Sequence, residues 1–168
     1  MSSRILIAGL GSVSFGDEGF GPEVLQHLQR ERRVRPELLP DGLRLLDCGV
    51  RALRLAYMLA SALERVLLID ATARGGRPGT LYLLDLDTDK APLELAPPLP
   101  PDKRPGALDL EAIFATARWL AARRLAPVQM LGCEPASLSG TELSATVRAA
   151  IGPAVDIVHR WLQERGGV

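Results

Sequence analysis

Apolar runs and amphipathic segments alternate along this chain, which indicates strands alternating with helices. Runs that are apolar at nearly every position are typical of strands covered on both faces. The first predicted strand starts at Ile5. The other four cover 43–47, 66–70, 79–85 (an edge strand) and 128–133. Apolar residues at helical spacing predict helices over 22–33, 52–63, 109–123 and 141–165. We therefore predict an α/β fold: a single doubly wound domain over residues 1–168, with a mainly parallel five-stranded sheet and helices on both faces.

Residues 87–105 interrupt this alternation. They include Pro97-Pro98 and Pro100-Pro101, and a stretch with so many prolines cannot form a regular element. We expect a long loop there.

Composition argues against several classes of function. The 20 basic and 20 acidic residues cancel, so there is no electrostatic reason to expect a nucleic acid or an anionic membrane surface as a partner. The first apolar run is too short for a signal peptide or a membrane span, so we expect no membrane insertion. Two cysteines make no disulfide framework, which favours a cytoplasmic setting.

The stretch between the first strand and the first helix is the most informative part of the sequence. It runs from Gly9 to Pro22 and contains the acidic pair Asp17-Glu18 among repeated glycines. A connection of this kind is usually about 2–6 residues long, so this one exceeds what linkage requires. Open α/β sheets place their sites at the carboxyl ends of such strands. We interpret the stretch as a site loop that supplies carboxylates.

Two common phosphate-binding loops do not fit this stretch. The dinucleotide fingerprint needs a third glycine where Ser14 stands, and the acidic pair would repel a pyrophosphate. The nucleotide P-loop needs a lysine, and the stretch has none. We therefore predict no nucleotide cofactor.

Acidic residues also stand at the ends of two further predicted strands, Asp47 after the second and Asp70 after the third. The carboxyl ends of parallel strands lie along one edge, so these residues are expected to converge on the first loop. Like charges brought together raise each other's pKa, and a cation, a catalytic proton or exposed backbone N–H groups commonly justify such a cluster. For Asp47 alone, a local role in its turn explains the residue equally well.

The cysteines and histidines carry less information. Cys48 and Cys133 stand at strand ends, where a thiolate would suit a soft metal, but a small buried hydrophobe is the commoner fate of a cysteine. His27 and His159 fall inside predicted helices, and we interpret both as ordinary helix residues.

Several motifs together resemble the hydrogenase maturation endopeptidases. The first loop is similar to their N-terminal signature, and the other matching stretches are spread over nearly the whole chain, at 47–51, 68–71, 78–82 and 132–138. This family trims the C-terminal tail from the large subunit of nickel–iron hydrogenases once nickel is in place. The resemblance implies that this chain is such an endopeptidase, with a hydrogenase large-subunit precursor as its partner.

The same resemblance implies roles for individual residues. Glu18 and Asp70 match two members of the family's metal-binding trio, so they are the expected catalytic residues and nickel ligands. The nickel is expected to come with the substrate. The expected substrate-binding positions lie in the first two loops and are Gly16, Asp17, Asp47, Cys48 and Gly49.

The third member of the trio is a histidine in the family, and the corresponding segment, 102–109, contains none. This departure leaves a second hypothesis open, a non-catalytic maturation chaperone or checkpoint protein of the same family. A third hypothesis is an α/β protein that binds a small ligand in an acidic pocket at this edge of the sheet.

Overall fold

The computed structural model describes residues 4–90 and 108–164. In these two stretches the chain forms a five-stranded sheet with the strand order β2-β1-β3-β5-β4. Four neighbouring strands are parallel, and the edge strand β4 runs antiparallel to β5. The strands are β1 Ile5–Leu10, β2 Leu43–Gly49, β3 Arg65–Ala71, β4 Leu81–Leu86 and β5 Val128–Cys133. The predicted fold class and the edge position of the fourth strand are confirmed.

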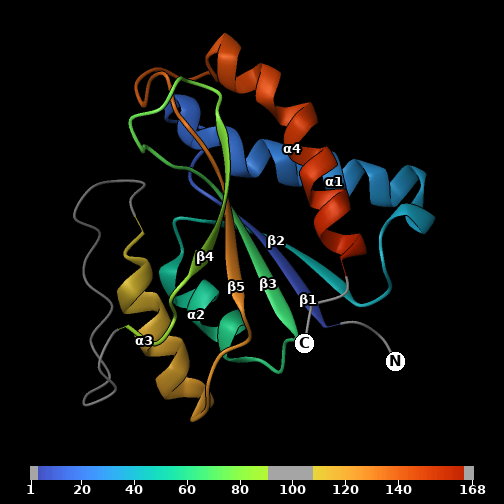
Figure 1. The fold of residues 1–168 in the computed structure, drawn as a ribbon, viewed down its shortest axis with the longest axis vertical. Coiled ribbons are helices and arrows are strands. Elements are labelled where there is room, and N and C mark those ends of the chain that lie inside the picture. Colours follow the sequence, from blue (N-terminus) through green and yellow to red (C-terminus); the bar gives the residue numbers. More distant parts are fainter. Residues whose placement is uncertain (1–3, 91–107, 165–168) are drawn as a thin grey trace.

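Within the described residues, four α-helices cover the two faces of this sheet (Figure 1). They are α1 Phe20–Val34, α2 Ala52–Ala60, α3 Leu110–Ala121 and α4 Ala145–Gln163. Alternate residues of β1 belong to two separate cores: Ile5 and Ile7 pack with α1 and α4, whereas Leu6 and Ala8 pack with α2 and α3. Burial on both faces explains why the strands are apolar at nearly every position.

The first two helices differ from the predicted ones at their ends. α1 begins two residues early, at Phe20, because a 3-10 helix over Gly16–Gly19 leads directly into it. α2 stops at Ala60, where the Ser61 hydroxyl donates to a carbonyl of the last turn. The predicted helix residue Leu63 is therefore buried outside the helix.

The last helix starts later than predicted. Ser144 caps it by accepting a hydrogen bond from the Val147 N–H at 3.4 Å, so residues 141–143 belong to the preceding loop. Most of the loop predicted over 87–105 lies outside the described residues, as does position 165, the predicted end of this helix.

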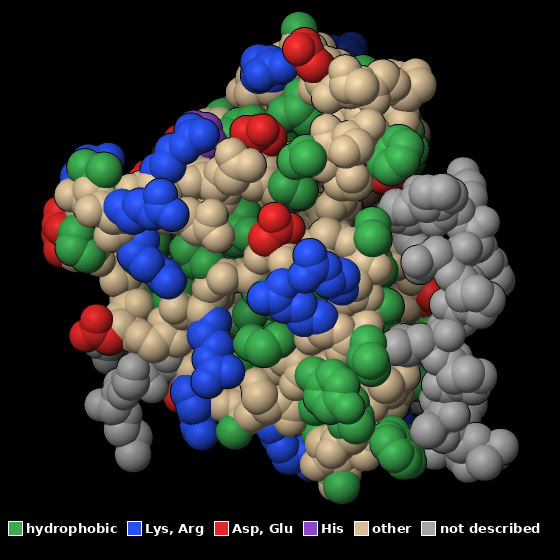
Figure 2. All heavy atoms as spheres, turned by 180° about the vertical axis from the view of Figure 1, so that it is seen from behind, with side chains coloured by type: hydrophobic (Ala, Val, Ile, Leu, Met, Phe, Trp, Pro, Cys, Tyr) green, Lys and Arg blue, Asp and Glu red, His purple; other side chains and the backbone are tan. Residues whose placement is uncertain are grey.

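The surface is uneven in charge although the total charge is zero. Figure 2 shows Lys and Arg side chains gathered over one face of the molecule, with few acidic side chains among them. Basic and acidic residues are equal in number over the whole chain, but basic side chains predominate on this face. In residues 4–90 and 108–164, no helix combines the length and the apolar character needed to cross a membrane.

Candidate functional site

The carboxyl ends of β2 and β3 meet the loop after β1 at Gly11. Its N–H donates to the Gly49 carbonyl at 3.2 Å, which joins the first loop to the end of β2. Its φ of +97° suits glycine, and an added Cβ would clash with the Glu18 carbonyl oxygen and lie 3.4 Å from Asp70 Oδ1. Gly11 therefore lies against both predicted site acids, at the carboxyl edge of the parallel strands.

Asp70 is a strongly perturbed acid at this edge. It lies near the end of β3, partly buried, and its Oδ1 accepts from the Ala71 N–H at 2.8 Å. Burial is the main cause that raises the pKa of Asp70 to about 7; the Ala71 hydrogen bond opposes the shift, and the charge of Glu18 adds to it. A carboxyl group in this state exchanges its proton near neutral pH.

Glu18 lies in the 3-10 helix Gly16–Gly19 that precedes α1. Its N–H donates to the Phe15 carbonyl at 3.1 Å, and its carboxylate oxygen Oε2 is shielded from solvent. The negative charge of Glu18 contributes to the raised pKa of Asp70. The structure thus brings the two predicted catalytic acids close enough to interact.

Asp17, the chain neighbour of Glu18, has a different environment. Its side chain is fully buried, and hydrogen-bond donors surround its carboxylate. Oδ2 accepts from the Ala136 N–H (2.8 Å), the Ser137 N–H (2.9 Å) and the Ser144 hydroxyl (3.0 Å), and Oδ1 accepts from the Ser144 N–H (2.7 Å). Burial raises the pKa of Asp17, but these bonds outweigh it and the pKa is lowered. Asp17 therefore binds the first loop to the loop after β5 and to the start of α4.

Glu134 makes a second connection of this kind, between β5 and the loop after β3. Its carboxylate accepts from the Arg74 N–H (2.8 Å), the Gly75 N–H (3.1 Å) and the Tyr82 hydroxyl (2.9 Å). The bond from the Arg74 N–H is the largest cause that holds the pKa of Glu134 below its ordinary value. Asp17 and Glu134 thus fix the loops around the carboxyl edge of the sheet.

The other predicted substrate-binding residues differ in what they present to solvent. Asp47 is an exposed residue on the edge strand β2. Cys48 packs in the core with α2, and burial raises the pKa of its thiol to about 11. Gly16 is buried, has a φ of +53° and donates its N–H to the Gly140 carbonyl at 2.8 Å.

Both histidines lie on helices, as predicted. His159 Nε2 lies 2.8 Å from Glu31 Oε2, between α4 and α1, and His27 is exposed on α1. Within the described part of the chain, no three His, Cys, Asp or Glu side chains form a group that could hold a metal ion. Residues 102–107, most of the segment that corresponds to the family's histidine, lie outside that part.

The paired carboxyl groups of Glu18 and Asp70 can do two kinds of chemistry. Their oxygens can contact a cation that another molecule brings, because two carboxylates leave most of the coordination shell of a divalent ion open. Asp70 can also accept or give a proton near neutral pH, since its pKa is about 7. Both uses require a partner at this edge of the sheet.

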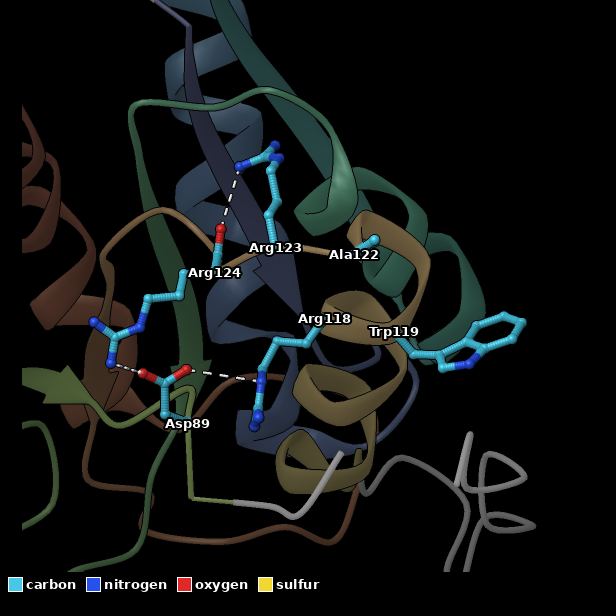
Figure 3. A pocket seen from close by; sticks show the side chains of 6 residues that line it. All are labelled: Asp89, Arg118, Trp119, Ala122, Arg123 and Arg124. Atoms are coloured by element: carbon cyan, nitrogen blue, oxygen red, sulfur yellow. Dashed lines mark hydrogen bonds and ion pairs between the residues drawn. The ribbon is translucent and has the colours of Figure 1, made fainter. Parts of the chain in front are cut away.

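A cavity of about 690 Å³ lies at the opposite end of the sheet, where α3 leads into β5. Figure 3 shows the Arg118 and Arg124 side chains directed toward Asp89, with Trp119 pointing away. The Arg124 Nη2–Asp89 Oδ2 distance is 2.5 Å, and the Arg118 Nε–Asp89 Oδ1 distance is 3.7 Å. Arg123 donates to the Ser61 carbonyl at 2.7 Å. These cations make contacts within the protein, and the predicted site acids are not among the residues that line the cavity.

The partners of the buried acids Asp17 and Glu134 could not be predicted from the sequence. Ser144 is recognisable as a helix cap, because it directly precedes an apolar periodic segment. Its bond to Asp17, however, joins residues that are 127 positions apart, so no local sequence pattern predicts it. Tyr82 likewise reaches Glu134 across 52 residues, from the neighbouring strand β4.

Comparisons with known proteins agree with this architecture. Residues 22–93 match the family model HycI, hydrogenase maturation protease. The chain is 31% identical to the hydrogenase expression/formation protein HupM of Azotobacter chroococcum mcd 1, over 98% of this chain and 74% of that protein. The hydrogenase 2 maturation peptidase of a Thaumarchaeota archaeon is 30% identical, with a TM-score of 0.68 over 97% of this chain and 100% of that one. The hydrogenase maturating endopeptidase HybD of E. coli, 24% identical, shares the fold with a TM-score of 0.69 over 97% of this chain and 94% of that one.

Proposed function

Because the chain belongs to the hydrogenase maturation protease family, we propose that it is an endopeptidase. Its substrate is the precursor of a nickel–iron hydrogenase large subunit that already holds nickel, and its product lacks the C-terminal extension. One observation carries this proposal: Glu18 and Asp70 interact at the carboxyl edge of the sheet, where burial raises the pKa of Asp70 to about 7.

The residues of this edge fit a nickel ion that comes with the substrate. Glu18 and Asp70 supply carboxylate oxygens, and within the described ranges no third His, Cys, Asp or Glu joins them to form a metal site. Ligands from the precursor would complete the coordination of the ion. Contact of the two acids with nickel would make a nickel-free precursor a poor substrate.

The same pair suits the proton transfer that hydrolysis needs. Hydrolysis adds the oxygen of water to the carbonyl carbon of the scissile bond and a proton to the leaving amine. A group that takes a proton from water works best when its pKa lies near the working pH, and without a bound cation the pKa of Asp70 is about 7. We assign the transfer to the Glu18–Asp70 pair as a unit, because interacting carboxyl groups titrate together.

The five substrate-binding positions remain part of this proposal. Asp47 offers an exposed side chain to the precursor. The side chains of Asp17 and Cys48 are buried, so these residues would act through the backbone of their loops. Gly16 and Gly49 have a positive φ, and the Gly16 N–H and the Gly49 carbonyl are already bonded to Gly140 and Gly11, so these glycines would act by shaping the loops that meet the precursor.

A second candidate function is a non-catalytic chaperone or checkpoint protein that binds the same precursor. The observation in its favour is the absence of histidine from 102–109, together with the placement of His27 and His159 on helices. Such a protein would hold the nickel-loaded precursor without cutting it.

Mass spectrometry of the precursor after incubation distinguishes these functions. Nickel-loaded and nickel-free precursor are incubated separately with the protein, and the Glu18→Gln variant serves as the matched control. The proposed endopeptidase yields a shortened large subunit only with wild-type protein and nickel-loaded precursor. A stable complex with a precursor of unchanged mass supports the chaperone. Failure of the protein both to cleave and to bind contradicts both functions.

A further inference from the structure

Three large apolar side chains are exposed on two loops next to Glu18. Val13 is 53% exposed and Phe15 is 42% exposed on the loop after β1, and Leu138 is 48% exposed on the loop after β5. A single exposed apolar side chain is common on protein surfaces and needs no explanation. These three stand out because their loops adjoin the proposed site, where the Glu18 N–H donates to the Phe15 carbonyl at 3.1 Å. We call Val13, Phe15 and Leu138 the apolar platform.

The two loops of the platform are bound to each other along their backbones. The Gly16 N–H donates to the Gly140 carbonyl at 2.8 Å, and the Asp17 N–H donates to the Ser137 carbonyl at 3.0 Å. A Cβ added to Gly16 would lie only 2.6 Å from the Ser139 carbonyl oxygen, so the two backbones approach as closely as glycine allows. The bonds accepted by the Asp17 carboxylate strengthen the same connection. The fold therefore holds the two loops that carry the platform in a fixed position relative to each other.

This arrangement does not benefit the fold itself. Apolar side chains held in solvent forgo the hydrophobic gain that burial would bring. The loops that present them are fixed by Asp17, a fully buried carboxylate. An apolar surface that is exposed and preorganised is typical of a site where another protein binds.

The platform also carries no charge. Residues 12–16 and 135–141 contain no Lys, Arg, His, Asp or Glu. Charged side chains begin at its border, where Glu142 and Arg148 line a cavity of about 140 Å³ together with Val13. An apolar centre with a polar rim is the usual anatomy of a protein–protein interface. A partner surface that matches this platform would be apolar rather than acidic or basic.

We propose that the apolar platform binds an apolar segment of the large-subunit precursor beside its nickel site. This inference rests on the proposed function, because Glu18 is what would bring the nickel next to the platform. The platform would contribute affinity that does not depend on the metal. The carboxylates of Glu18 and Asp70 would then add the recognition of nickel.

The test measures binding of the nickel-loaded precursor to the full chain. We expect Phe15→Ser combined with Leu138→Ser to weaken binding at least about 10-fold, without lowering the unfolding temperature, because both side chains are exposed. The matched control is Val34→Ser, which removes an apolar side chain that is 78% exposed at the far end of α1 and should leave binding unchanged. If the double variant unfolds, Val13→Asp places a charge on the same platform and should weaken binding as much.

The failure of this inference and the failure of the proposed function give different results. Wild-type affinity in the folded double variant, with cleavage by the wild type intact, overturns the platform and leaves the proposed function standing. An equal loss of binding in the Val34→Ser control also overturns the platform. A wild-type protein that neither binds nor cleaves the precursor overturns the proposed function, and the role of the platform with it.

Discussion

Asp17 and Glu18 are adjacent in the chain but reach opposite kinds of environment. The Asp17 carboxylate accepts hydrogen bonds from the loop after β5 and from the start of α4. The Glu18 carboxylate interacts with Asp70, whose pKa is raised to about 7 by burial, with the charge of Glu18 adding to the shift. Two neighbouring carboxylates thus have different roles: Asp17 holds loops together, whereas we propose that Glu18 contacts the substrate.

The difference shows how structural acids can be told from functional ones. N–H donors around a carboxylate favour its charged form, so the pKa values of Asp17 and Glu134 are lowered. Burial beside a second acid disfavours the charged form, so the pKa of Asp70 is raised. The hydrogen bonds to Asp17 and Glu134 stabilise the fold, whereas the burial of Asp70 beside Glu18 does not. Acids with pKa values raised in this way are common at functional sites.

The largest expected loss of stability comes from Asp17→Asn. An amide nitrogen would face N–H donors where a carboxylate oxygen now accepts, and the buried donors left unpaired should cost about 3 kcal/mol. Urea unfolding measures this loss. The matched control is Asp156→Asn, an exposed position on α4, which should change stability by less than about 0.5 kcal/mol. Equal stabilities in the two variants would show that Asp17 does not hold the loops together.

A smaller loss is expected from Gly16→Ala. Its Cβ would lie 2.6 Å from the Ser139 carbonyl oxygen, at a φ of +53°. Gly140 also has a positive φ, +91°, but apart from its chain neighbours no atom of the described residues lies within 4 Å of its Cβ position. Both alanine variants bear a backbone strain of about 1–2 kcal/mol, and only Gly16→Ala must also separate the loops. In urea unfolding we expect Gly16→Ala to be the less stable of the two; the reverse order would contradict the close approach of these loops.

Because the pKa of Asp70 is raised, the Asp70→Asn variant should gain stability relative to the wild type as the pH rises. Folded Asp70 keeps its proton up to about pH 7, whereas its ordinary pKa, which applies to the unfolded chain, is 3.8. The folded state therefore binds more protons between these values, and wild-type stability falls as the pH rises through this window. The asparagine variant lacks this loss, so its stability relative to wild type should rise by up to about 4 kcal/mol between pH 4 and pH 8, the free-energy equivalent of the full shift. Urea unfolding at several pH values measures the difference, and a difference that is constant with pH would rule out the shift.

Much of the fold could be predicted from the sequence because the strands are buried on both faces. In β1, Ile5 and Ile7 belong to one core and Leu6 and Ala8 to the other, which produces the continuous apolar run. The end of α2 and the start of α4 were harder to predict, because each depends on a single hydroxyl group. Ser144 moves the start of α4 beyond the apolar pattern, for example.

The candidate site could be predicted only in part. The glycine-rich loop and the acids at strand ends placed Glu18 and Asp70 at one edge, and the structure brings them together. The separate role of Asp17 could not be predicted, because its hydrogen-bond donors lie 119 to 127 residues away in the chain. Asp17 and Glu18 cannot be told apart from their sequence context. Their roles differ because hydrogen-bond donors surround the Asp17 carboxylate in the structure, whereas Glu18 interacts with Asp70.

The most direct test of this account is the Glu18→Gln variant, measured for unfolding temperature and for processing of the nickel-loaded precursor. The substitution keeps the size of the side chain and removes a charge beside Asp70. We expect an unfolding temperature no more than about 2 °C below that of the wild type, and no shortened large subunit by mass spectrometry. A loss of stability as large as that of Asp17→Asn, or processing at the wild-type rate, would contradict the claim that Glu18 acts on the substrate while Asp17 holds the fold.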